Sequence, residues 1–270
     1  MNWSNTYQQL TNRNIGLLTE AQQEKLRTTR VAVCGLGGIG SPIAEMLCRL
    51  GIGSFHILDH GTFEPTNLNR QIYSFVDTDT RLKTDVTDEF LRRINPEVEC
   101  AKFEEITTNN VAEFLLGVDI IVLGIDTVKP CIIISREARR LKIPIVEGWA
   151  VVAGNVRVFT PETPSLEEVY SFPTAGRNPD NLTPEEETEL LLLTLSRVQE
   201  QIQGLSDFYP PAAMQRIEEK GEGTTLAPLV WLTCSLMATE VMKLLLNWGQ
   251  PALAPHFASY NPIVHRTMNS

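Results

Sequence analysis

Glycines and an acidic residue in one early stretch of the chain have the types and spacing of a nucleotide site. The glycines directly follow the four small or apolar residues 31–34, and they are Gly35, Gly37, Gly38 and Gly40. Glycine lets the backbone turn sharply and approach a phosphate without a Cβ in the way. Asp59 follows Gly40 by nineteen positions, and a doubly wound fold places its ribose-binding carboxylate about 20 residues after the loop. The stretch therefore predicts a strand, a phosphate loop, a helix and an acid that together bind a nucleotide.

Charged residues further along suit phosphoryl or nucleotidyl transfer. Arg70 follows Asp59 by eleven residues in an irregular loop, and Lys83 comes thirteen residues later, just before a helical pattern. Asp126 ends an apolar stretch that predicts a buried strand, and a carboxylate there can hold Mg²⁺. Reactions at phosphorus depend mostly on positioning and charge neutralisation. Two cations and a magnesium-binding carboxylate supply both.

The elements that must position these residues alternate between strand and helix. Strands are predicted at 30–34, 54–58, 98–103, 118–126 and 144–147, with helices after the glycine loop and at 84–94, 110–116 and 131–141. Such alternation predicts a mainly parallel sheet with right-handed crossovers. The fold class is therefore α/β, a Rossmann-like doubly wound sheet.

The pattern changes after Gly148. Residues 150–159 predict two strands that turn at Gly154-Asn155, the start of an antiparallel C-terminal extension. Further on, the chain predicts a helix at 184–203 with Thr183 and Glu186 as a capping box, a long apolar helix at 227–246 and a last strand at 257–264.

Four parts follow from these changes: a helical segment 1–29, a nucleotide-binding core 30–160, a variable acidic insert 161–223 facing the substrate, and a helix and strand at 224–270 that complete the core. We expect segment 1–29 to pack outside the sheet or against another subunit. Eight acids stand against one base, Arg177, within residues 161–190. This balance disfavours a nucleic-acid partner, and it leaves a solvated acidic loop or a docking surface for a basic partner as the alternatives.

Composition favours a cytoplasmic protein without membrane contact. The 270 residues carry a formal charge of −10, no apolar run approaches the roughly 20 residues that span a bilayer, and the start lacks a signal pattern. Five cysteines are scattered along the chain, without a close pair that could hold zinc. Buried, reduced thiols are expected.

Several strings together resemble the ThiF/MoeB/HesA group of the ubiquitin-activating-like superfamily, which are ATP-dependent adenylyltransferases. The most specific is Asn67-Leu68-Asn69-Arg70-Gln71. The others are Arg13 with Gln23-Glu24-Lys25-Leu26, the glycine loop, Asp59, Lys83, Asn95-Pro96, Asp126, and Ala238-Thr239-Glu240-Val241-Met242-Lys243. The resemblance covers residues 13–160 and about 221–246.

The resemblance implies roles for the matching residues. Gly38 would pack on the phosphates of ATP, Asp59 would bind ribose, and Asp126 would hold Mg²⁺. The triphosphate would be held by Asn67, Arg70 and Lys83, and ATP contacts are also expected from Gly35, Gly37, Gly40, Asn69 and Gln71. Arg13 resembles an arginine that reaches into a neighbouring subunit's site, which implies a homodimer. By the same resemblance, Arg70, Lys83, Asp126 and Arg13 are the catalytic set.

The implied reaction is attack by a carboxylate on the α-phosphate of ATP, giving an acyl-adenylate and pyrophosphate. The carboxylate would belong to a peptide or small protein, either the tail of a ubiquitin-like or sulfur-carrier protein or a precursor peptide. The chain lacks the Cys-x-x-Cys pairs of many relatives, has no cysteine at 161–223, and has Thr127 where relatives often have Asn. We therefore expect activation without a covalent thioester.

Two other hypotheses stay open. An NAD-dependent oxidoreductase would bind NAD(H) tightly and would not need Arg70. A non-catalytic member of the same fold would bind a protein partner unchanged after loss of Lys83, and would release no pyrophosphate.

Overall fold

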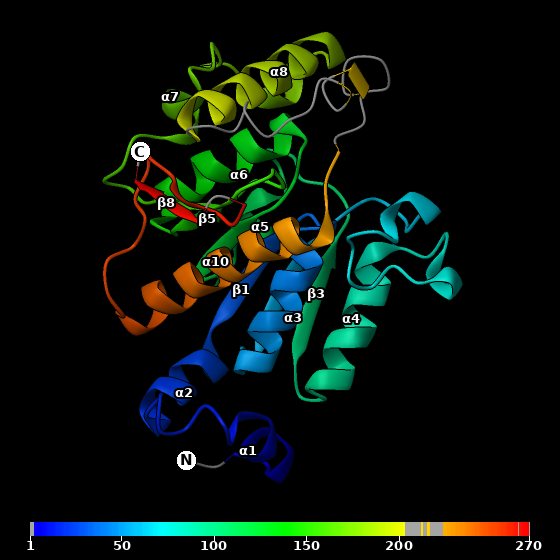
Figure 1. Ribbon diagram of the computed structural model, residues 1–270, viewed down its shortest axis with the longest axis vertical. Coiled ribbons are helices and arrows are strands. Elements are labelled where there is room, and N and C mark those ends of the chain that lie inside the picture. Colours follow the sequence, from blue (N-terminus) through cyan, green and yellow to red (C-terminus); the bar gives the residue numbers. More distant parts are fainter. Residues whose placement is uncertain (1–2, 203–211, 213–214, 217–223, 264, 270) are drawn as a thin grey trace.

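A computed structural model describes residues 3–202, 212, 215–216, 224–263 and 265–269. Its centre is an eight-stranded sheet in the order β3-β2-β1-β4-β5-β6-β7-β8 (Figure 1). The strands are β1 (Arg30–Cys34), β2 (Ser54–Leu58), β3 (Glu99–Phe103), β4 (Ile120–Leu123), β5 (Ile145–Glu147), β6 (Gly154–Phe159), β7 (Ala258–Asn261) and β8 (Arg266–Asn269). The first five strands in this order, β3, β2, β1, β4 and β5, pair in parallel. Strands β6, β7 and β8 continue the sheet with antiparallel pairing. The predicted doubly wound sheet with an antiparallel extension is confirmed.

Helices cover both faces of the sheet. Alternate residues of β1 point to opposite sides, so that Val31 and Val33 pack in one apolar cluster while Ala32 and Cys34 pack in the other. The first cluster includes side chains of α3 (Gly40–Leu50), α4 (Lys83–Ile94) and α10 (Ala227–Leu246). The second includes α5 (Val111–Phe114), α6 (Val128–Leu141), α7 (Leu166–Tyr170) and α8 (Pro184–Gln201). Figure 1 shows α7 and α8 as a further layer beyond α6.

The N-terminal helices pack at the far end of α3. They are α1 (Asn5–Thr11) and α2 (Glu20–Thr28), and Thr19 caps α2 as expected. The Tyr7 hydroxyl donates to the carbonyl of Gly51 at 2.7 Å, and the Gln23 side chain donates to the carbonyl of Leu50 at 2.9 Å. Gly51 ends α3 with φ 100°, a left-handed cap that suits glycine. Residues 3–29 therefore lie outside the sheet, which is one of the two expected placements.

The hairpin expected at 150–159 is wrong, because the structure has a single strand, β6, after an irregular turn. The Asn155 side chain closes that turn, since its amide donates to the carbonyls of Trp149 and Ala153 and its oxygen accepts from the Trp149 amide. Gly154 is not a hairpin glycine. A Cβ there would come within 2.6 Å of Leu232 on α10, so glycine lets the helix approach the sheet.

The predicted helix at 184–203 is confirmed. Helix α8 ends at Gln201, and the capping box of Thr183 and Glu186 is present, while residue 203 lies outside the described part of the chain. The last predicted strand, 257–264, is too long, because β7 covers Ala258–Asn261 and residues 262–263 form a turn, with residue 264 outside the description. The turn leads to β8, which was not predicted.

One helix has membrane-like length and composition. Helix α10 was predicted from the sequence, but at 20 residues, with an 18-residue window of mean hydropathy 1.6, it is long and apolar enough to cross a membrane, contrary to the expectation that no apolar run approaches that length. A core helix of a soluble protein passes the same test, and α10 packs on β6 and α3.

Candidate active site

The sheet register lines up the strand ends that carry the candidate residues. Leu58 pairs with Cys34, Cys34 with Leu123, and Leu123 with Glu147, so these residues form one row across β2, β1, β4 and β5. Strand order reverses between β1 and β4, and ligands of doubly wound folds bind at the carboxyl ends there. Asp59 and Gly35 come one residue after the row and Asp126 comes three residues after it, so all three lie at this edge of the sheet.

Asp59 holds the glycine loop in place. Its Oδ2 accepts from the Leu36 amide at 2.7 Å, and its Oδ1 accepts from the Gly61 amide, also at 2.7 Å. Two of the glycines are needed because the loop folds tightly on itself. Gly35 has φ 82°, and a Cβ on Gly40 would lie 1.7 Å from the carbonyl oxygen of Gly35. The loop is therefore prepared before any ligand arrives.

Arg70 lies across this loop. Its Cγ and Cδ are 3.4 and 3.6 Å from the position a Cβ of Gly38 would take. Its Nη1 donates to the Thr66 carbonyl and to Oδ1 of Asn69, at 3.0 and 2.8 Å. These bonds engage one nitrogen of the guanidinium, and the indole of Trp231 donates to the Arg70 carbonyl at 3.0 Å. The arginine is thus fixed above the loop with donors to spare.

Lys83 and Asp126 bring opposite charges to the same cavity. The Lys83 Nζ lies 3.4 Å from the place a Cβ of Gly61 would occupy. Within the described ranges, neither Lys83 nor Asp126 has a side-chain hydrogen bond or ion pair. A cation and an exposed carboxylate left unpaired beside a phosphate-type loop are available to a ligand.

One cavity of about 900 Å³ joins these residues. Most of the predicted site residues line it, namely Gly35, Gly37, Gly38, Asp59, Arg70, Gln71, Lys83 and Asp126. Gln71 is 6% exposed, and its Oε1 has no hydrogen-bond partner among the described residues. A buried acceptor without a partner at a cavity wall points to a missing donor.

Four predicted residues lie outside the lining. Gly40 shapes the loop, and Asn67 is buried and accepts from the Glu64 amide at the start of a short 3-10 turn (Pro65–Asn67). Asn69 orients Arg70. Arg13 is exposed beside α1, at the end of α3 opposite the glycine loop, so it does not reach the cavity of its own chain. Its predicted role requires a second subunit.

A buried cluster that was not predicted from the sequence lies beside the cavity. Arg157 is fully buried, and its Nε donates to Oε2 of Glu147 at 2.6 Å. Tyr170 donates its hydroxyl to Glu147 at 2.9 Å and accepts from the Trp149 indole at 2.9 Å. An arginine between the apolar residues Val156 and Val158 was the one available signal, because a lone charge in a buried strand needs a partner.

The cavity contains one thiol of note, Cys131 on α6. Burial, followed by the nearby carboxylate of Glu147, raises the pKa of this thiol well above its ordinary value. A protonated thiol is a poor nucleophile. Of the five cysteines, all are free and none forms a metal cluster with other described residues.

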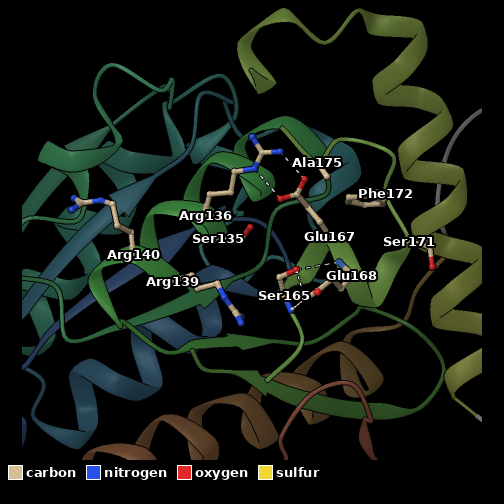
Figure 2. Close-up of a pocket in the computed structure, with 10 residues that line it drawn as sticks. All are labelled: Ser135, Arg136, Arg139, Arg140, Ser165, Glu167, Glu168, Ser171, Phe172 and Ala175. Atoms are coloured by element: carbon tan, nitrogen blue, oxygen red, sulfur yellow. Dashed lines mark hydrogen bonds and ion pairs between the residues drawn. The ribbon is translucent and has the colours of Figure 1, made fainter. Parts of the chain in front are cut away.

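A second hollow, of about 780 Å³, lies against α6 and α7 (Figure 2). Its main polar feature is an ion pair in which Nε and Nη2 of Arg136 donate to the two carboxylate oxygens of Glu167, at 2.8 and 2.7 Å. Arg136 also donates to the carbonyls of Thr174 and Arg177. Burial alone would raise the pKa of Glu167, but the bonds from Arg136 and Thr174 outweigh it and the pKa is lowered. These contacts anchor the start of the insert.

Fold and site together define a nucleotide-binding protein of the doubly wound α/β class. The chain belongs to the ThiF family, whose model matches residues 11–269. It is 37% identical over 118 residues to the tRNA threonylcarbamoyladenosine dehydratase of Escherichia coli (strain K12), covering 43% of this chain and 44% of that protein. It is 31% identical over 157 residues to the molybdopterin-synthase adenylyltransferase of Haemophilus influenzae, covering 54% and 62%.

A solved structure shares the fold. The crystal structure of E. coli MccB with ATP aligns with a TM-score of 0.68 at 19% identity, over 99% of this chain and 71% of that one. The two curated relatives are matched over less than two thirds of their own lengths, so they identify the family and leave the activity of this chain to be argued from its site.

Proposed function

We propose that this protein is an ATP-dependent adenylyltransferase that activates the carboxylate of a peptide or small protein as acyl-AMP and releases pyrophosphate. One observation carries the proposal. Arg70, Lys83 and Asp126 come from three separate segments and line one cavity with the glycine loop and Asp59. The H. influenzae relative is named a molybdopterin-synthase adenylyltransferase, and that name supports the same chemistry.

The residues present fit ATP. The loop glycines leave room for phosphates at the start of α3, where free amides and the helix dipole favour an anion. Both Asp59 oxygens already accept backbone amides, and each keeps a lone pair for a ribose hydroxyl. The unpartnered Oε1 of Gln71 accepts a hydrogen bond from the ligand or from a water bound with it.

The chemistry follows from these charges. The substrate carboxylate is ionised near pH 7, well above its reference pKa of about 4, so it attacks without a general base. A carboxylate oxygen bonds to the α-phosphorus, the bond from that phosphorus to the bridging oxygen breaks, and pyrophosphate leaves with the electron pair. Arg70 and Lys83 neutralise the charge that builds up on the phosphate oxygens. When bound at Asp126, Mg²⁺ would add to that neutralisation.

Exposed acids in the cavity lining favour a protein or peptide over a nucleic acid as the source of the carboxylate. Glu104 and Glu105 are exposed, line the cavity, and have no ion pair in the described chain. The E. coli relative is named for a tRNA modification. Two unpaired carboxylates in the lining would repel a phosphate backbone, which needs basic residues.

We also propose a homodimer. Helix α10 exposes Trp231 at 39%, and Leu226 just before the helix is 64% exposed. Exposed apolar side chains of this size support a protein interface. Trp231 contacts the loop of Arg70, so an interface here would adjoin the site. A dimer is also what brings Arg13 within reach of a cavity.

Titration calorimetry with Mg-ATP tests the nucleotide. Removing one charge-assisted contact loses about 1.5–3 kcal/mol, so Arg70→Ala should weaken ATP binding about 10- to 150-fold. Arg81→Ala is the matched control, since Arg81 is exposed and pairs with Glu89 away from the cavity. Binding of NADH that exceeds binding of ATP would favour an oxidoreductase instead.

Pyrophosphate exchange tests the reaction. We expect carboxylate-dependent ATP–pyrophosphate exchange that disappears in Asp126→Ala while ATP binding remains detectable. Exchange that survives this substitution would remove Asp126 from the mechanism. ATP binding without exchange for any carboxylate would favour a non-catalytic binding protein.

A further inference from the structure

The lining of the cavity near β5 includes three aromatic side chains, Trp149, Tyr170 and Phe172. Glu147 stands opposite Leu123 in the sheet, one strand beyond the strand that leads to Asp126. Neighbouring strands are about 4.8 Å apart, so this part of the lining adjoins the proposed phosphate site on the side away from Asp59. We define the aromatic compartment by the four side chains that line the cavity there, Trp149, Leu166, Tyr170 and Phe172.

A continuous chain of hydrogen bonds fixes two of these side chains. The Trp149 indole donates to the Tyr170 hydroxyl at 2.9 Å, and Tyr170 donates to Glu147 at 2.9 Å. Arg157 donates to the other side of the same carboxylate at 2.6 Å. The ring of Tyr170 stacks on Phe172, with centroids 5.5 Å apart. Each group in this chain has a partner that determines its orientation.

The charges behind the compartment are already matched. The side chains of Arg157 and Glu147 are 0% and 4% exposed, and they pair with each other. Arg157 itself does not line the cavity, because its guanidinium lies against the rings of Tyr170 and Phe257, 4.7 and 4.2 Å from their centroids. Arg157 Nη2 has no hydrogen-bond partner among the described residues, but it lies behind the lining. A charged group that entered the compartment would therefore lose its water without reaching a free counter-charge.

Most of this wall comes from the insert. Leu166, Tyr170 and Phe172 belong to residues 161–223, whereas the phosphate-side residues all come from the core. Arg136 and Glu167 anchor α7 to α6 (Figure 2). The insert is therefore placed to select a substrate group without touching the nucleotide loop.

Building on the proposed function, we propose that the aromatic compartment binds the residue that carries the activated carboxylate and selects an apolar side chain there. Glu147 and Arg157 are positioning residues that hold Tyr170 and Trp149 as the wall of this subsite. The substrate class is a peptide or protein tail whose activated end bears an apolar or aromatic residue rather than a charged one.

The first experiment measures ATP–pyrophosphate exchange with acetylated tripeptides, acetyl-Gly-Gly-X, where X is Phe, Leu, Gly, Asp or Lys. We expect kcat/KM for Phe or Leu to exceed that for Asp or Lys by about tenfold or more, because an apolar pocket rejects an unpaired charge. ATP binding is measured in parallel by calorimetry.

The second experiment asks whether the hydrogen-bond chain acts on binding of the acyl group. Tyr170→Phe keeps the ring and removes the hydroxyl. We expect its KM for acetyl-Gly-Gly-Phe to rise about tenfold, the effect of losing one organising hydrogen bond, with KM for ATP and kcat changed less than about twofold. Glu147→Gln, which still accepts from Tyr170, should keep a lower KM than Glu147→Leu. Arg49→Gln, an exposed partner of Glu45, is the surface control.

Each outcome decides the matter. A preference for Phe and Leu that weakens in Tyr170→Phe supports the inference. Three outcomes would overturn the inference while the adenylyltransferase proposal stands. They are exchange without preference among the tripeptides, a preference for Asp or Lys, and a Tyr170→Phe variant that loses kcat at unchanged KM. ATP binding without exchange for any tripeptide overturns the stated substrate class. Absence of ATP binding overturns the proposed function itself.

Discussion

Replacing Arg157 by Met should destabilise the folded protein strongly. The substitution removes the Nε bond to Glu147 and the Nη1 bonds to Gln201 and the Pro255 carbonyl, at 2.6, 2.8 and 3.2 Å. It leaves the Glu147 carboxylate buried with no cation. Breaking a buried pair from one side costs about 3–5 kcal/mol, a large share of the roughly 5–15 kcal/mol that holds a domain folded. Methionine still fills space among the rings.

A double-mutant cycle separates the ion pair from the packing. We expect Arg157→Met and Glu147→Gln together to lose less unfolding free energy than the sum of the two single losses, by about 1–3 kcal/mol. Urea unfolding followed by tryptophan fluorescence gives the three free energies. Simple additivity would show that the charges do not depend on each other, and the account of the cluster would fail.

Two further predictions concern the surroundings of the cavity. Glu167→Gln should destabilise the protein by about 1.5–3 kcal/mol near pH 7, because it weakens the charge-assisted bonds with Arg136. The folded pKa of Glu167 is lowered, so this difference should persist above the unfolded value of about 4.3 and vanish as the pH falls through the lowered pKa. Unfolding curves at several pH values check it. Cys131→Ala should retain exchange activity and form no acyl adduct by intact mass spectrometry, since the raised pKa keeps this thiol protonated. A thioester at Cys131 would contradict both the pKa and the expected route.

The nucleotide half of the site could be predicted from sequence because its signals are local. Glycines, Asp59 and the Arg70 string lie close together in the chain, and the alternation of strands and helices fixes which sheet edge they share. Even Asp126, far along the chain, was found because it comes three residues after the end of β4. Parallel strands bring their carboxyl ends to one edge whatever the loop lengths.

The prediction of a hairpin at Gly154-Asn155 is wrong because a Gly-Asn pair can mark either a hairpin turn or a site of tertiary contact. Gly154 and Asn155 are turn formers in isolation, but here Gly154 admits α10 and Asn155 closes the preceding turn with three hydrogen bonds. Both partners are tertiary, and α10 lies more than seventy residues away in sequence. A prediction from local residue preferences takes no account of contacts with such distant segments.

The acyl half of the cavity depends on distant pairings in the same way. Glu147 and Arg157 meet because β5 and β6 are antiparallel with Glu147 opposite Arg157, a register that the predicted hairpin would have broken. Tyr170, which belongs to the insert, donates its hydroxyl to Glu147 and so joins the pair from a third segment of the chain. If the proposed function and the proposed acyl subsite both hold, replacing the insert while keeping the strand ends should retain the reaction and change which carboxylate is activated, because the phosphate-side residues all come from the core.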